Sequence, residues 1–367
     1  MDKPAVIRRG LLRRGMGALL VLALTAAAAP ADGADPSGLR PCPTGAGWER
    51  LSLSRLPRRD GSGERAGGFS AVLVEPDGQG VLLLSDGPQG WLALAQLGGA
   101  EGGPRLTGRR PLRSGPAAAL PAAMDGEAMV RRGASLWLAS EGRRTPEQPP
   151  QLLRVKAASG ELEQVLDLPA DWQAGPGRGL AANGGPEALA LLRRTGQADA
   201  LLMAAETPLL QDPPGQVRLL AWSLATDPPV ARPLAPLRLP WGPWGLTDLL
   251  AVTDGRGGTA LLALLRRFEP PDRWGARLAL YPLPAAIPAA AAADPRTRAV
   301  PPLASWDLLA APLGLPADNW EGLAAGPPLP DGRPTLVLVS DDNFSAFQDN
   351  VLAVLAPLRL STCSPLP

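Results

Sequence analysis

The stretch Asn319–Gln348 reads NWEGLAAGPPLPDGRPTLVLVSDDNFSAFQ. Its first apolar segment opens with Trp320-Glu321-Gly322-Leu323, and its second is Val337-Leu338-Val339-Ser340-Asp341. The turn residues Pro330-Asp331-Gly332 lie between them. Two short apolar runs joined by a turn indicate an antiparallel β-hairpin. In such a hairpin the start of the first strand faces the end of the second, so we expect Glu321 to lie near Asp341.

The same pattern recurs four more times in the chain, as a polar or acidic residue, a small or apolar residue and an apolar run. These copies are Phe69–Val72, Gly126–Met129, Pro186–Leu189 and Thr247–Leu250. The second positions, spaced by 57, 60, 61 and 73 residues, are Ser70, Glu127, Glu187, Asp248 and Glu321. The apolar strand that follows ends in an acid in four copies, namely Asp86, Glu141, Glu206 and Asp341. In the fourth copy it ends in Leu265-Arg266 instead.

A repeat of about 60 residues that holds four short strands has the size of a propeller blade. The composition, 45% hydrophobic with 42 glycines and 44 prolines, fits short strands joined by many turns. We therefore predict an all-β fold, a single β-propeller over residues 40–367. The chain length favours six blades, the sixth combining Trp48–Leu56 with Val351–Leu360 to close the ring. Arg105–Ala123 and Pro284–Pro302 are expected to be loops, and two separate β-sandwiches are the alternative.

The N-terminus has the features of an export signal. Five basic residues lie within the first 15 positions, and residues 16–29 are small and apolar. We predict a signal peptide over residues 1–31, cleaved after Ala31 or Ala34. Fourteen apolar residues are fewer than the ~20 that span a bilayer, so no membrane span is expected after cleavage. An uncleaved anchor is the alternative, and Arg8-Arg9 leaves open whether export follows the general or the twin-arginine route.

Export bears on the only two cysteines, Cys42 and Cys363, which lie near the two ends of the mature chain. An oxidising compartment favours a disulfide between them that ties the chain ends together. Two free thiols are the alternative.

Several classes of chemistry are excluded by composition. The chain has no histidine, which removes Ser-His-Asp and Cys-His nucleophile systems and His-ligated zinc. Lys3 and Lys156 are the only lysines, and two cysteines cannot build a zinc or iron–sulfur cluster. A formal net charge of +1 argues against a nucleic-acid partner. Catalysis would have to rely on carboxylates, arginines, hydroxyls, backbone groups or a hard metal ion.

The repeated acids should converge on one mouth of the propeller channel if the first strand of each unit lines the axis. This group contains Asp86, Asp125, Glu127, Glu141, Glu187, Glu206, Asp248, Glu321, Asp341 and Asp342. Crowded carboxylates are costly unless protons or a cation compensate them. An oxygen-rich, nitrogen-poor ligand set suits Ca²⁺, with Mg²⁺ or Mn²⁺ as alternatives. Alternatively, these acids cap strand ends and bind backbone amides or arginines.

The same residues resemble a known family, the phytase-like "esterase-like activity of phytase" family. Asn319–Gln348 matches its N-[FW]-E-G-x-A start, its L-P-D-G-R turn and its V-S-D-D-N-F-S end. Asp125–Ala128, Glu187–Ala190 and Ala205–Leu209 resemble further family segments, so that the similarity extends over about residues 65–357. The resemblance implies an exported bacterial β-propeller, periplasmic or extracellular, with ester or phosphoester hydrolysis and calcium dependence. Leu265 departs from the glutamate that is usual in the family.

Two functions remain as hypotheses. The first is a calcium-assisted hydrolase that acts as a monomer on a small ester or phosphoester, with Glu141 or Glu206 as general base and Arg178 and Arg266 holding negative charge. Its metal ligands would be Asp86, Asp125, Glu127, Glu187, Asp248, Glu321, Asp341 and Asp342. The second is a non-catalytic propeller that binds a ligand or partner at the same mouth, with structural calcium. A lyase or lactonase activity on the same scaffold is a further alternative.

Overall fold

The computed structural model describes Pro36, Asp294 and the ranges 38–98, 103–145, 147–193, 196–253, 258–292 and 296–359. The predicted signal peptide, residues 1–31, lies outside the described residues. Cys363 lies outside them too, so its pairing with Cys42 stays a prediction. No helix in the described ranges is long and apolar enough to cross a membrane.

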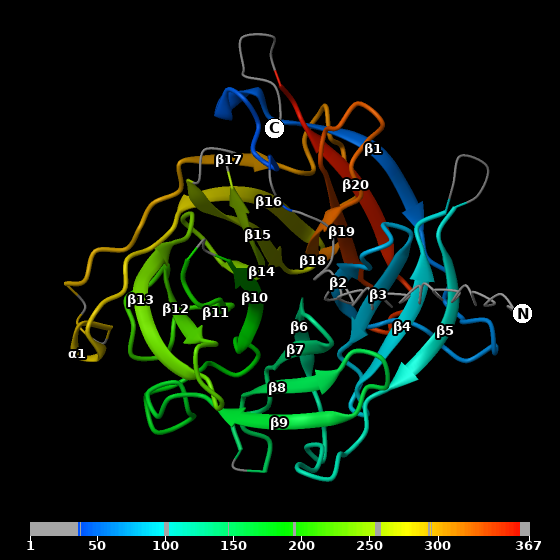
Figure 1. The fold of residues 1–367 in the computed structure, drawn as a ribbon. Helices are drawn as coiled ribbons and strands as arrows, with labels where there is room; N and C mark the ends of the chain where they lie inside the picture. Colours follow the sequence, from blue (N-terminus) through cyan, green and yellow to red (C-terminus); the bar gives the residue numbers. More distant parts are fainter. Residues whose placement is uncertain are drawn as a thin grey trace, which may run out of the picture.

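Five four-stranded antiparallel sheets surround a common axis, so the fold is an all-β propeller (Figure 1). Blade 1 contains β2 (Phe69–Val74), β3 (Gly80–Ser85), β4 (Trp91–Gln96) and β5 (Arg105–Pro111). Blade 2 contains β6 (Gly126–Arg132), β7 (Ser135–Ser140), β8 (Gln151–Lys156) and β9 (Leu162–Asp167). Blade 3 contains β10 (Pro186–Leu192), β11 (Ala200–Ala205), β12 (Gln216–Ser223) and β13 (Val230–Arg238). Blade 4 contains β14 (Trp244–Thr253), β15 (Thr259–Glu269), β16 (Arg273–Pro282) and β17 (Ala304–Asp307). Blade 5 contains β18 (Asn319–Gly326), β19 (Thr335–Asp341), β20 (Val351–Pro357) and β1 (Trp48–Arg55).

The prediction of six blades is wrong, because the two terminal segments assigned to a sixth blade belong to the fifth. β1 pairs with β20 in an antiparallel ladder from Trp48 opposite Pro357 to Arg55 opposite Val351. The N-terminal strand is thus the outermost strand of a blade whose other three strands come from the C-terminal end. Ring closure by strands from both ends of the chain is confirmed, and Cys42 lies beside Arg359 just beyond this ladder.

The inner strand of every blade is the repeated motif found in the sequence. β2 and β18 are buried along their whole length, and β10 nearly so, because each inner strand packs between two neighbouring blades. Strands covered on both faces read as continuous apolar runs rather than as alternating patterns. Gly322 shows how close the packing is, since a Cβ there would lie 2.6 Å from Val339 Cγ1 and 2.9 Å from the backbone nitrogen of Val72.

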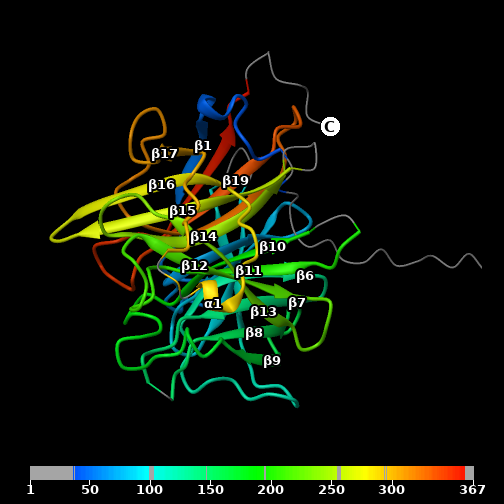
Figure 2. The ribbon, with the colours of Figure 1, turned by 90° about the vertical axis from the view of Figure 1, so that its left-hand side faces the viewer.

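The two predicted loops contain secondary structure. The first, Arg105–Ala123, begins with β5, which has a single buried residue, as suits the outer edge of blade 1. The second, Pro284–Pro302, contains the four-residue helix α1 (Ala289–Ala292) beside β13. A short 3₁₀ helix, Thr44–Ala46, precedes β1. The long hairpin of β15 and β16 extends well beyond the other blades at one end of the propeller (Figure 2).

Candidate functional site

A β-bulge near the start of each inner strand sets the first ring of side chains. The pairing between the inner and the second strand skips one residue at this point in all five blades. A bulge leaves the extra residue unpaired and redirects its side chain. The skipped residues are Ser70, Glu127, Glu187, Thr247 and Glu321.

A second ring follows from the same register. The inner-strand residue before each bulge pairs with a residue of the second strand, which is the last or next-to-last one except in blade 4, where it is Leu265 within the longer β15. The residue that follows this partner belongs to the second ring. These positions are Asp86, Glu141, Glu206, Arg266 and Asp341. We call the end of the channel that carries both rings the acidic mouth. In blade 4 the two positions hold Thr247 and Arg266, so this blade contributes a hydroxyl and a cation instead of two acids.

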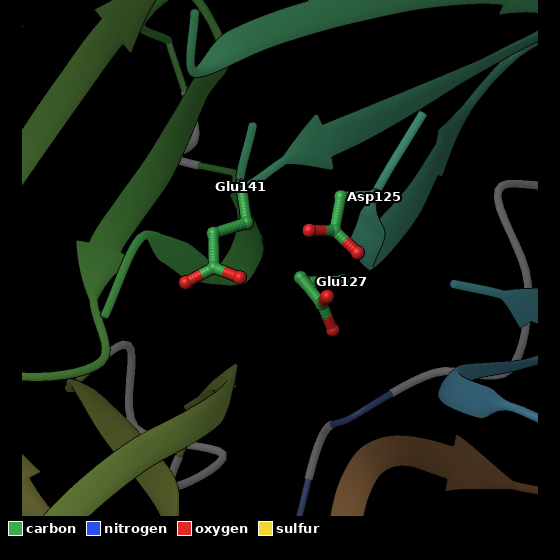
Figure 3. Close-up of side chains that lie close together, drawn as sticks. All are labelled: Asp125, Glu127 and Glu141. Atoms are coloured by element: carbon green, nitrogen blue, oxygen red, sulfur yellow. The ribbon is translucent and has the colours of Figure 1, made fainter. Parts of the chain in front are cut away.

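Three carboxylates of blade 2 lie close enough to share a cation. Asp125 precedes β6, Glu127 lies on its bulge and Glu141 follows β7; one carboxylate oxygen of each lies within 4.8 Å of the others. Figure 3 shows the three groups facing a common space. Ca²⁺ binds oxygens at 2.3–2.6 Å, so oxygens this far apart can surround one ion. Asp125 Oδ2 is buried and lies 2.7 Å from Arg143 Nη1, so this carboxylate already attracts a positive charge.

Burial and mutual repulsion raise the pKa values of carboxyl groups at the acidic mouth. Burial is the main cause that raises the pKa of Glu141 to about 7. The backbone N–H of Gly185, which donates to Glu141 Oε1 at 2.8 Å, acts in the opposite direction and lowers this pKa. Burial raises the pKa of Asp86 to about 7 as well, with Glu321 and Asp125 adding repulsion. The pKa of Glu127 lies well above its ordinary value for the same reasons, burial first and then Glu321. Carboxyl groups in this state gain stability from a cation.

Arg266 supplies such a cation to the other half of the mouth. Its Nη2 donates to Glu206 Oε1 at 2.8 Å and lies 3.9 Å from Glu187 Oε2, while its Nη1 lies 3.7 Å from Glu321 Oε1. Nη1 also donates to Asn319 Oδ1 at 2.7 Å. Burial opposes the charge of Arg266, but the surrounding carboxylates outweigh it and raise its pKa. Arg266, proposed from sequence to hold a substrate anion, is therefore fully engaged with protein groups.

Asp248 lies deeper in the channel than the sequence repeat indicated. The bulge residue of β14 is Thr247. Asp248 follows the bulge by one position, so it does not belong to the first ring of side chains. Its Oδ1 accepts from the backbone N–H of Leu249 at 2.8 Å, and its Oδ2 from that of Leu323 at 2.7 Å. Burial raises its pKa well above the ordinary value. This carboxyl group thus bridges the exposed edges of two inner strands, β14 and β18.

Asp341 and Asp342 also have partners within the protein. Asp342 accepts from the backbone N–H of Gly68 at 2.9 Å and forms an ion pair with Arg65 at 3.1 Å. Asp341 accepts from the backbone N–H of Asn343 at 2.9 Å, and burial together with Glu321 raises its pKa well above the ordinary value. Both residues match the alternative in which strand-end acids bind backbone amides and arginines.

Two functional candidates were not found by sequence reasoning. Arg143 follows Glu141 by two residues; its Nη1 lies 2.7 Å from Asp125 Oδ2 and 3.7 Å from Glu141 Oε2, and its side chain is 54% exposed. Asn319 donates through Nδ2 to Glu321 Oε1 at 2.7 Å and so orients that carboxylate. By contrast, Arg178 is exposed in the loop between β9 and β10 and pairs through its backbone with Gly175.

A pocket of about 220 Å³ opens beside the blade 2 acids. Glu141, Arg143, Arg144 and Asn183 are among the residues that line it. Arg144 is fixed, since its Nη2 donates to the backbone oxygen of Gly175 at 3.0 Å and its Nη1 to that of Leu180. Arg143 is thus the cation with most of its surface available to a bound molecule.

Comparisons with known proteins match most of the chain to one family. The family model described as "Esterase-like activity of phytase" matches residues 64–344. No curated protein matches the sequence. Among solved structures, the GH32 β-fructofuranosidase BmSUC1 of Bombyx mori is similar with 11% identity and a TM-score of 0.40, over 90% of this chain and 65% of that one. A structure titled glucose dehydrogenase is similar with 12% identity and a TM-score of 0.40, over 83% of this chain and 99% of that one.

Proposed function

The chain belongs to the phytase-like family, and on this premise we propose that it is an exported, calcium-dependent hydrolase of small ester or phosphoester substrates. One observation carries the proposal: three carboxylates of blade 2 share a common space beside a pocket lined by Arg143. The protein would act as a monomer in the periplasm or outside a bacterial cell, with Cys42 and Cys363 joined.

Asp125 and Glu127 are the residues proposed to hold the cation, and Glu141 faces the same space. The donor set consists of oxygens alone, as Ca²⁺ prefers over softer metals. A bound cation would polarise the scissile group and lower the pKa of a neighbouring water. Arg143 Nη1 lies 2.7 Å from Asp125 Oδ2, and a bound cation would displace it. The guanidinium group would then be free to turn toward the pocket. Glu187, Glu206 and Glu321 already have Arg266 as counter-charge, so we place the cation at blade 2 rather than among all predicted ligands.

Glu141 is the favoured general base. Its pKa of about 7 suits a group that takes a proton at neutral pH, whereas Glu206 is held by Arg266 at 2.8 Å. In the proposed reaction Glu141 accepts a proton from the attacking water, whose oxygen forms a new bond to the carbonyl carbon or to phosphorus. The ester C–O or P–O bond then breaks, and the leaving alcohol takes up the proton from Glu141. Arg143 would bind the negative charge of a phosphoryl or carboxyl group, as a guanidinium with free donors can.

The test is release of p-nitrophenol from acyl and phosphoryl esters by the mature protein, with calcium or with a chelator. We expect release that needs calcium and falls at least 100-fold in Glu127→Gln. Glu64→Gln is the matched control, because Glu64 is an exposed acid that contacts Arg109 and lies outside the mouth. Release that is equal with calcium and with chelator would contradict the proposal.

A non-catalytic propeller is the second candidate, and one observation favours it. Asp248, Asp341 and Asp342 accept hydrogen bonds from backbone amides, so part of the acidic group is satisfied without metal or substrate. In that case the folded protein would bind calcium, measured by calorimetry, and release no p-nitrophenol from any ester.

A further inference from the structure

The pocket beside the blade 2 acids limits the size of the group that can enter it. Its volume is about 220 Å³, and its wall comes from two loops, residues 141–150 between β7 and β8 and residues 168–185 between β9 and β10. A cavity of about 150 Å³ holds benzene, so this pocket has room for about nine carbon-sized atoms. Half of its lining residues are apolar, namely Pro150, Ala174, Leu180, Ala181 and Ala182. A compact, largely apolar group fits such a wall.

The charged residues of the same wall are positive on balance. They are two guanidinium groups, those of Arg143 and Arg144, and one carboxylate, that of Glu141. Arg144 donates to the backbone oxygens of Gly175 and Leu180, and within the described ranges no carboxylate pairs with it. Neutral oxygens leave its charge without a counter-ion, so the pocket attracts an anion.

Arg143 is the residue that can bind this anion directly. It contacts Asp125 and Glu141 through Nη1, and its side chain is 54% exposed, so the guanidinium group can bind a further acceptor in the pocket. A phosphate monoester carries a charge of about −1.5 to −2 at neutral pH, and guanidinium groups bind phosphoryl oxygens through paired hydrogen bonds. A neutral carboxylic ester would leave the excess positive charge of the wall uncompensated. Charge complementarity therefore favours the phosphoester among the two substrate classes considered above.

We propose that the preferred substrate is the phosphate monoester of a compact, uncharged alcohol of up to about nine non-hydrogen atoms, with the phosphoryl group beside Arg143 and the alcohol against Leu180 and Ala181. The inference rests on the proposed function, since Glu141 would act on the same phosphoryl group. On hydrolysis the oxygen of water bonds to phosphorus, the P–O ester bond breaks, and the alcohol leaves with the proton that Glu141 took from the water. A second phosphate on the alcohol is disfavoured, because the apolar side chains of the wall offer it no donor.

Calorimetric binding of alkylphosphonates by the mature protein with calcium tests the inference without turnover, because their P–C bond has no ester oxygen to hydrolyse. The affinity should rise at least tenfold from methylphosphonate to butylphosphonate, since each buried methylene tightens binding by up to about fourfold. The gain should end at about nine carbons. Butane-1,4-diyl bisphosphonate, which adds a second charged group at the far end of the same chain, should bind at least tenfold more weakly than butylphosphonate. Affinity that does not vary with chain length, equal binding of the bisphosphonate, or no binding by folded protein would overturn the inference.

Variants locate the ligand in the pocket. Ala181→Leu should fill the pocket and remove the preference for butylphosphonate over methylphosphonate, and Ala158→Leu in the exposed turn between β8 and β9 is the matched control. Arg143→Met should weaken the binding of both phosphonates at least tenfold and keep the preference for the longer chain. Its control is Arg273→Met, since Arg273 is 71% exposed on β16 outside this pocket. Unchanged affinity and unchanged chain-length preference in Ala181→Leu and Arg143→Met would overturn the assignment to this pocket.

Failure of this inference can be told apart from failure of the hydrolase. Release of p-nitrophenol that needs calcium, together with phosphonate binding that ignores chain length, would overturn the inference and leave the hydrolase standing. Phosphonate binding with the expected length preference, by a protein that releases no p-nitrophenol, would support the pocket as the site of such a ligand and overturn only its hydrolysis.

Discussion

Replacing Arg266 by methionine would show whether an internal cation stabilises half of the acidic mouth. The side chain is 16% exposed, and its guanidinium lies within 4 Å of three glutamates, the closest being Glu206 at 2.8 Å. Removing one partner of a buried ion pair costs about 3–5 kcal/mol, because the other charge stays buried without compensation. For a propeller of this length such a loss lowers the Tm by about 4–7 °C.

The pH dependence of this loss separates charge from packing. At pH 8 the glutamates left without Arg266 must either ionise unpaired or take up protons, and both are unfavourable. At pH 5 protonation is easier, because burial already raises the pKa of Glu187 and that of Glu321. The difference in Tm between wild type and Arg266→Met, measured by scanning calorimetry with chelator present, should therefore be larger at pH 8 than at pH 5.

A neighbouring arginine on the same strand serves as the control. Arg267 is 39% exposed and pairs with Glu269 at 3.2 Å, so Arg267→Met should cost about 1 kcal/mol or less. Adding Glu206→Gln to Arg266→Met should recover part of the lost stability, since it removes one unpaired charge. An equal Tm loss at both pH values, or no recovery in the double variant, would refute the electrostatic explanation.

Three further predictions concern the same end of the molecule. The pKa of Asp86 and that of Glu141 rise to about 7 on folding, so the folded state binds more protons than the unfolded state between about pH 4 and 7. Without calcium, the free energy of unfolding should therefore fall by several kcal/mol as the pH rises through this window. A Tm that is higher at pH 8 than at pH 5 would contradict this prediction. Asp248→Asn replaces one acceptor by a donor against the amides of β14 and β18, which should cost about 1–3 kcal/mol in urea unfolding, and an unchanged midpoint would show that the bridge is dispensable. In Gly185→Ala the new Cβ would lie 2.1 Å from Glu141 Cγ and 2.9 Å from its Cα, so the variant should have a lower Tm and a displaced Glu141. At a temperature where both proteins are folded, calorimetry should find weaker calcium binding by the variant, and unaltered affinity would argue against a place for Glu141 beside the cation.

The repeated motif predicted the inner strands well because its signal is local. Each copy combines a continuous apolar run with a bulge residue, and all five copies became inner strands. The blade number could not be obtained by dividing chain length by repeat size, since extra residues lengthen the β15–β16 hairpin and the loops instead of adding a blade. Nor could the sequence show that β1 would complete the same blade as β20, because that pairing joins opposite ends of the chain.

Sequence reasoning named Asp125, Glu127 and Glu141, which lie close together in the structure, but it assigned Asp248 to the wrong position. The bulge moves the register by one residue, and in β14 this exchanges Thr247 for Asp248 at the mouth. Since successive strand residues face opposite ways, a one-residue error changes a predicted ligand into a backbone bridge. Arg143 could have been found from sequence as a cation two residues beyond Glu141. The contacts of Arg266 with acids of blades 3 and 5 could not, because they depend on the fold.

The departure of blade 4 from the repeat explains why calcium should bind on one side of the acidic mouth. A mouth with acids at every repeated position would offer equivalent sites around the axis. With Thr247 and Arg266 in blade 4, one guanidinium neutralises the neighbouring acids of blades 3 and 5. Blade 2 is farther round the ring, and two of its acids, Asp125 and Glu141, pair with the half-exposed Arg143, which a cation can displace. An added cation gains most where fixed positive charge is least buried, so calcium should bind at blade 2, and Arg266→Met should create a second, weaker calcium site at Glu187 and Glu206 that calorimetry can count.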